Sequence, residues 1–139
     1  MNKSAYYLAI LILSCTGSLH AQTVELFELQ KKCAVEAKKY YLENKSDITP
    51  PRSGNTVLYE YHYNKKRGLC LLRVYGSNGN FPYFTFDSVL SVLENKSIAS
   101  YHEGINDKNE SKVMICNYDG KKCSSSTEFE KIIGNLMFE

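Results

Sequence analysis

The five cysteines are the feature that most constrains how this chain of 139 residues folds. Cys15 lies inside an N-terminal segment typical of export, and the four others are Cys33, Cys70, Cys116 and Cys123. An even number of cysteines in a small exported domain predicts two disulfides, for which three pairings are open. At about 2–4 kcal/mol each, two such bridges supply much of the net stability of a small domain.

The N-terminal segment has the parts of a signal peptide. Lys3 gives it a positive start, residues 5–13 form an apolar run, and Leu19-His20-Ala21 ends in a small residue suited to cleavage. The apolar run is much shorter than the roughly 20 residues that cross a membrane. We therefore expect residues 1–21 to be a signal peptide. Residues 22–139 then form a single periplasmic or secreted domain without a transmembrane segment.

The same segment has a second interpretation as a lipoprotein signal. Ile12-Leu13-Ser14-Cys15 resembles a bacterial lipobox, in which Cys15 is lipidated and anchors the chain to the outer membrane. The sequence favours cleavage after Ala21 over lipidation at Cys15. Both leave the same four cysteines for disulfides.

The net charge of the mature chain indicates which classes of partner it can attract electrostatically. The signal peptide contains Lys3 and no acidic residue, so the remaining chain keeps 16 of 17 basic residues against 15 acidic ones. This near-zero balance gives no electrostatic support for binding to nucleic acid or to an anionic membrane. We expect another protein or an envelope component as the partner, and the oligomeric state stays open.

The first half of the mature chain reads as a helix followed by a hairpin. Thr23–Asn44 carries an apolar stripe at helical spacing, with Thr23 as its N-cap, and Lys45–Thr56 is a loop containing Pro50-Pro51. The stripe consists of Leu26, Leu29, Cys33, Ala37 and Tyr40. Val57–Tyr63 alternates as a strand does, and Leu69–Tyr75 returns after a turn over 64–68.

The second half contributes further strands and a closing helix. Phe81–Phe86 reads as an edge strand because Pro82 cannot donate to a ladder. Val89–Glu94 and Ile98–His102 form a second hairpin, although periodicity alone leaves a helical turn after Asp87 open. Lys112–Tyr118 is a strand.

The closing helix spans Ser125–Phe138 and begins with a capping box. The box is formed by Ser125 with Glu128 or by Thr127 with Glu130. The order of a helix, about five antiparallel strands and a helix predicts a two-layer α+β domain stapled by disulfides.

One disulfide pairing is favoured by the turn chemistry. Cys116 and Cys123 bracket Asp119-Gly120 symmetrically, so a two-residue turn would place them opposite each other on paired strands. Cys33 and Cys70 are then partners by elimination. The cysteines match neither the C-x-x-C of thiol oxidoreductases nor a structural zinc site. We therefore expect no metal and no cofactor, with redox or metal chemistry as the alternative.

An aromatic and basic segment is the candidate binding surface, since tyrosine is amphipathic and costs little entropy to order. Its members are Tyr59, Tyr61, His62, Tyr63, Lys65, Lys66, Arg67 and Tyr83. The alternatives are an aromatic core in a domain without tryptophan and a solvated basic loop.

His62 and Glu60 are the only candidate for catalysis. They share a strand face one pleat apart, and a carboxylate beside an imidazole is a pattern typical of general acid–base catalysis. The simpler interpretation is a solvated pair on a half-exposed strand. We therefore expect no catalytic residues, with a small hydrolase using His62 and Glu60 as the alternative.

The chain resembles a group of small exported bacterial proteins of unknown function. The likeness rests on Lys32-Cys33-Ala34, on Tyr59–Lys66 followed by Cys70, and on Cys116 and Cys123 leading into Glu128-Phe129-Glu130. That group has Lys-Cys where this chain has Leu69-Cys70. The resemblance implies an exported α+β domain with four structural cysteines, and it implies no reaction. We expect a non-enzymatic domain of the cell envelope that acts by binding.

Overall fold

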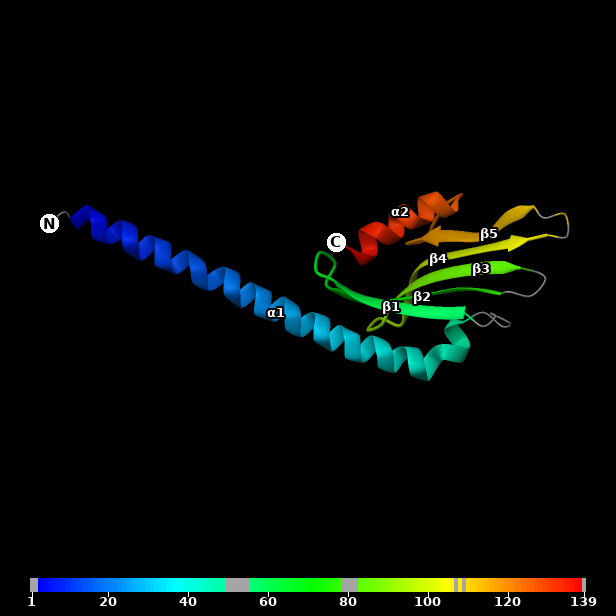
Figure 1. The fold of residues 1–139 in the computed structure, drawn as a ribbon, viewed down its shortest axis with the longest axis horizontal. Helices are drawn as coiled ribbons and strands as arrows, with labels where there is room; N and C mark the ends of the chain where they lie inside the picture. Colours follow the sequence, from blue (N-terminus) through cyan, green and yellow to red (C-terminus); the bar gives the residue numbers. More distant parts are fainter. Residues whose placement is uncertain (1–2, 50–55, 79–82, 107, 109, 139) are drawn as a thin grey trace.

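The chain folds into a sheet of six strands with one helix on each face, as seen in a computed structural model (Figure 1). The structure describes residues 3–49, 56–78, 83–106, 108 and 110–138, with side chains from residue 22 onward. The elements are α1 (Lys3–Ile48), β1 (Thr56–Asn64), β2 (Leu69–Asn78), β3 (Phe84–Ser91), β4 (Lys96–Ile105), β5 (Ser111–Tyr118), β6 (Lys121–Lys122) and α2 (Ser126–Met137). All strands pair antiparallel in chain order.

The α+β class, the two helices and the antiparallel sheet are confirmed, but the prediction of two layers is wrong. Leu71 packs in the core under α2, while its neighbours Cys70 and Leu72 pack under α1. Successive strand residues point to opposite faces, so α1 and α2 must cover opposite faces of the sheet (Figure 1). The unbroken apolar run at the start of β2 is the sequence signal of a strand buried on both faces.

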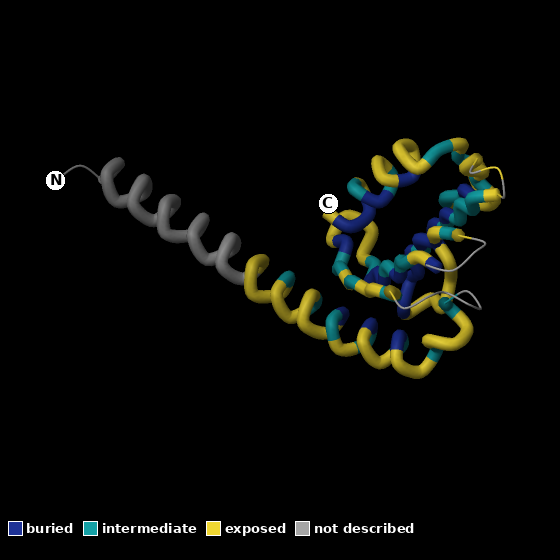
Figure 2. Tube along the Cα trace, turned by 45° about the vertical axis from the view of Figure 1, so that its right-hand side comes forward, coloured by how far each residue is buried: buried dark blue, intermediate teal, exposed yellow. Residues whose placement is uncertain are grey.

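Each helix packs on one face of the sheet and covers a separate hydrophobic core. On one face α1 buries Cys33, Ala37 and Tyr41 against β1 and β2, and Figure 2 shows buried segments on the side of α1 that faces the sheet. On the other face α2 buries Phe129 and Ile133. The two cores share the strands but no side chains.

The disulfides join Cys33 to Cys70 and Cys116 to Cys123, which is the favoured pairing. The first ties α1 to β2 across a Cα–Cα distance of 5.3 Å. The second closes the β5–β6 hairpin, whose turn residues Asp119 and Gly120 have φ angles of 47° and 78°. Both angles lie in the left-handed region that an Asp-Gly turn of this type requires.

Two elements differ from the prediction. α1 runs through Thr23, so that residue caps no helix end, and it continues to Ile48, so residues 45–48 are helix rather than loop. β3 is one strand where the sequence suggested an edge strand over 81–86 and another strand over 89–94, and it lies between β2 and β4. Asp87 and Ser88 look like a break in the sequence, yet both sit within the β2–β3–β4 ladders. Residues 79–82 lie outside the described part of the chain.

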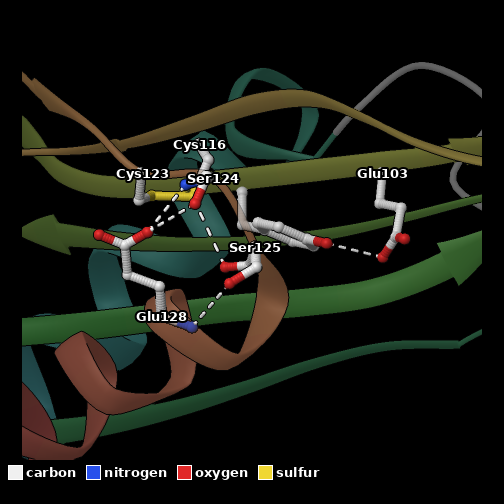
Figure 3. The surroundings of a disulfide bond; sticks show 7 residues. Glu103, Cys116, Cys123, Ser124, Ser125 and Glu128 are labelled. Atoms are coloured by element: carbon white, nitrogen blue, oxygen red, sulfur yellow. Dashed lines mark hydrogen bonds between the residues drawn. A yellow bond between two sulfur atoms is a disulfide. The ribbon is translucent and has the colours of Figure 1, made fainter.

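The N-cap of α2 is Ser125, as the capping box predicts (Figure 3). Its hydroxyl accepts a hydrogen bond from the backbone N–H of Glu128 at 3.2 Å. The Glu128 carboxylate returns to Ser124, accepting from its N–H at 2.9 Å and its hydroxyl at 3.1 Å. The Glu128 side chain therefore bonds to Ser124, the residue before the N-cap, rather than to the N-cap N–H that a capping box uses.

We predict that Asn64→Ala lowers the free energy of unfolding by about 1–3 kcal/mol, because buried polar groups would lose their partners. Asn64 is buried, and its amide donates to the Leu136 carbonyl at 2.9 Å while its side-chain oxygen accepts from the Arg67 N–H. It thereby holds the end of α2 to the β1–β2 turn. Urea unfolding measures the loss. Lys65→Ala, an exposed change in the same turn, should stay within about 0.5 kcal/mol, and an equal loss in both variants would contradict this role.

Candidate functional site

A groove of about 430 Å³ opens on the α2 face of the sheet, beside the first turns of α2. Its lining includes Leu58, Arg73, Tyr75, Asp87, Tyr101, Glu103 and Glu130. We call this feature the acidic groove. Strand periodicity places these β-strand side chains on the α2 face, and the N-terminal end of α2 forms one wall.

Arg73 is the centre of an ion-pair network in this groove. Its Nε lies 3.0 Å from Asp87 Oδ1, its Nη1 3.0 Å from Glu60 Oε1, and its Nη2 3.3 Å from Glu130 Oε1. The guanidinium also lies 4.8 Å from the ring centroid of Tyr75. A planar guanidinium with five donors can satisfy several carboxylates at once, and here it joins β1, β3 and α2.

The network leaves an excess of negative charge. Burial raises the pKa of Asp87, and the hydrogen bonds and charge of Arg73 oppose that rise, while Glu130 and Glu60 add to it. Burial acts to lower the pKa of Arg73, but its bonds to Asp87 and Glu60 and the charge of Glu130 outweigh burial and raise it. Arg73 therefore stays protonated among three carboxyl groups.

Glu103 adds a further carboxylate at the other side of the groove. Tyr101 donates its hydroxyl to Glu103 Oε2 at 2.7 Å, and Ser111 donates to Oε1 (Figure 3 labels Glu103). These two hydrogen bonds lower the pKa of Glu103 despite partial burial. The groove thus presents a fixed anion beside aromatic side chains.

The tyrosines of the predicted binding surface lie on the α1 face of β1. Tyr59 stacks on Tyr41 with ring centroids 4.2 Å apart, and Tyr63 packs beside the α1 core. Tyr61 is 49% exposed. Two of these three side chains therefore serve packing, which is the alternative that the sequence left open. Tyr83 precedes β3 and lies at the opposite end of the sheet from the β1–β2 turn.

The basic residues of that surface lie in the β1–β2 turn, where Lys65, Lys66 and Arg67 are exposed. Arg67 binds Asp119 at 3.2 Å and also donates to the hydroxyl of Tyr118. His62 lies on the α2 face, opposite the tyrosines, because strand side chains alternate. The predicted residues are therefore distributed over both faces and both ends of the sheet rather than forming one surface.

His62 and Glu60 share the α2 face, as their spacing predicts, but neither lines the acidic groove. The Glu60 carboxylate pairs with Arg73. Nε2 of His62 is buried and has no hydrogen-bond partner among the described residues. Among the described residues, Glu60 is therefore engaged by Arg73, while His62 Nε2 has no polar partner.

We predict that the chain loses stability as the pH falls through the ordinary histidine pKa of 6.5. Burial lowers the pKa of both His62 and His102, so the unfolded chain binds more protons than the folded one in this range. Urea unfolding between about pH 7.5 and about pH 5.5 measures the loss. His62→Gln with His102→Gln should flatten the profile, and an unchanged slope would refute the assignment.

Arg73, Asp87, Glu103 and Glu130 are the site residues that sequence reasoning missed. One signal was present, because a single arginine inside the apolar strand Leu69–Val74 must find buried partners. The identity of those partners depends on the β2–β3 register and on where α2 docks, which the sequence pattern does not specify.

Comparison with protein-family models, curated proteins and solved structures found no match. Among the described residues, no group of three or more His, Cys, Asp or Glu side chains is arranged to hold a metal ion. In the same part of the chain, no helix is both long and apolar enough to cross a membrane.

Proposed function

We propose that this chain is an exported binding domain of the bacterial cell envelope, acting without catalysis and holding its partner in the acidic groove. The signal-like segment 1–21 supports export, with cleavage after Ala21 and release into the periplasm as the favoured route. The two disulfides are compatible with an oxidising compartment.

The observation that carries the proposal is the charge and shape of the acidic groove. Glu60, Asp87 and Glu130 pair with one cation, Arg73, and Glu103 adds a fourth carboxylate across a concave surface of about 430 Å³. Leu58 is 50% exposed at this groove, so apolar surface adjoins the charges. An extended protein segment with alternating basic and apolar side chains is the complementary partner.

A peptide titration tests the proposed partner class. The protein is purified from the periplasm of a bacterial host and titrated with a blocked heptapeptide that alternates lysine and leucine, while amide chemical shifts are followed by NMR. We expect shifts at groove residues such as Thr85, Glu103 and Ser126. The variant Glu103→Gln with Glu130→Gln should bind roughly fivefold more weakly, since two negative charges are removed.

The matched control peptide carries glutamate in place of lysine and should leave the groove shifts unchanged. Equal binding of both peptides, or shifts confined to residues outside the groove, would contradict the proposal. Lys121→Gln with Lys122→Gln, an exposed pair in β6, serves as the control variant and should bind as the unmodified chain does.

A further inference from the structure

α1 carries its basic residues and most of its acidic residues on different sides of the helix, which the net charge of the chain does not reveal. Cys33, Ala37 and Tyr41 face the sheet, so the opposite side of the helix points away from the domain (Figure 2). With about 100° between successive residues, Val24, Val35 and Leu42 fall within about 20° of one another on that outward side, and Phe27 lies about 60° away on the flank. Val24, Phe27, Val35 and Leu42 are 55%, 62%, 62% and 65% exposed.

The lysines of α1 flank this apolar stripe. Five exposed lysines share an arc of about 140° with these apolar side chains, namely Lys31, Lys32, Lys38, Lys39 and Lys45. The two at the margins also meet the domain, since Lys32 lines a pocket with Tyr63 and the ammonium group of Lys45 lies 5.9 Å from the ring centroid of Tyr41. Of the five acidic residues between Gln22 and Ile48, only Glu28 falls within this arc; the other four lie along one flank. No ion pair joins any of the five lysines to another described residue. We call this arc the basic apolar face.

We propose that the basic apolar face docks on an anionic lipid surface, with the four apolar side chains entering the headgroup region and the lysines contacting lipid phosphates. An apolar stripe bordered by lysines is the pattern of helices that lie in the plane of a membrane. Lysine stems can cover apolar surface while their ammonium groups reach the phosphates. The stripe extends over 19 residues, or about 27 Å of helix between the first and the last, which is long enough for a parallel contact.

Charge complementarity selects this occupant over a second copy of the chain. Two basic apolar faces packed together would bring their lysines into proximity, and like charges across an interface oppose association. Nucleic acid would match the lysines but would leave Phe27 and Leu42 without a role. The acidic groove lies on the other face of the sheet, so docking through α1 leaves it open to a partner (Figure 1).

Vesicle binding tests the proposal. Protein purified from the periplasm is mixed with vesicles of phosphatidylethanolamine and phosphatidylglycerol, or with vesicles of phosphatidylcholine, and bound protein is measured by co-sedimentation. We expect at least about tenfold stronger partitioning to the anionic vesicles, with a steep loss in high salt. Phe27→Glu should weaken this binding roughly tenfold, and so should Lys38→Gln with Lys45→Gln.

The matched controls make the same kinds of substitution outside the basic apolar face. Phe138→Glu alters an even more exposed phenylalanine, and Lys121→Gln with Lys122→Gln removes two exposed lysines; both should bind vesicles as the unmodified chain does. Unchanged urea midpoints verify that each variant is folded. The proposal is overturned by equal binding to both vesicle types. It is also overturned if the lysine changes weaken binding while Phe27→Glu does not, or if Phe27→Glu abolishes a dimer detected by sedimentation.

Discussion

Replacing Arg73 by methionine is expected to lower the free energy of unfolding by about 3–5 kcal/mol. The side chains of Arg73 and Asp87 are 13% and 11% exposed, so the substitution leaves a buried carboxylate without its cation. The three strands and α2 that the guanidinium connects also lose their common partner. Urea unfolding at neutral pH measures the loss.

Two further variants isolate the cause. Asp87→Leu should cost less than Arg73→Met, because Arg73 keeps Glu60 and the exposed Glu130 as partners. Combining both substitutions should recover part of the loss, since no buried charge is then left unpaired. A double variant as unstable as Arg73→Met alone would show that lost packing, rather than the unpaired Asp87, causes the effect.

The second large effect is expected from the disulfide between Cys33 and Cys70. It links residues 37 apart in sequence, and its removal by alanine substitution should cost about 4 kcal/mol through the added freedom of the unfolded chain. The same bond ties α1 to the sheet, so its loss should also expose α1 to proteases. Urea unfolding and limited proteolysis under oxidising conditions provide the measurements.

The disulfide between Cys116 and Cys123 supplies the matched comparison. It links residues only 7 apart, so its removal by alanine substitution should cost about 2.5 kcal/mol. The difference between the two pairs tests the chain-entropy explanation directly. A larger loss from the short loop would contradict that explanation and point to a role of this hairpin in positioning α2.

Local chemistry accounts for the elements that the sequence predicted well. Asp119-Gly120 specifies a tight turn, and that turn by itself aligns Cys116 with Cys123. Ser125 and Glu128 mark the start of α2 within one turn of helix. Such signals are contained in a few neighbouring residues, so one sequence suffices to recognise them.

The acidic groove could not be predicted in this way, because its members come from five separate elements. Arg73, Asp87 and Glu130 meet there, with Glu60 beside them, only after β1, β2 and β3 pair in register and α2 docks across them. The polar pair Asp87-Ser88 even suggested a break in β3, since its ladder partners are not visible in the sequence. Long-range pairing therefore determines this site.

The basic apolar face of α1 was missed for a different reason. Its helical periodicity is present in the sequence, but a count of net charge averages the outward lysines with the acidic residues on the neighbouring flank. Only the structure identifies which side of α1 the sheet covers, through Cys33 and Ala37. The distribution of charge, rather than its sum, is what bears on partners.

Photo-cross-linking in living cells tests the central claim, a partner held in the acidic groove, most directly. A cross-linking amino acid is placed at Leu58, which is 50% exposed in the groove, and at Met114, which is 56% exposed on β5 and is not part of its lining. We predict a discrete adduct at Leu58 that is weakened by Glu103→Gln with Glu130→Gln and is absent at Met114. An adduct of equal strength at both positions, or one at Leu58 that is insensitive to the two glutamate changes, would contradict the groove as the binding site.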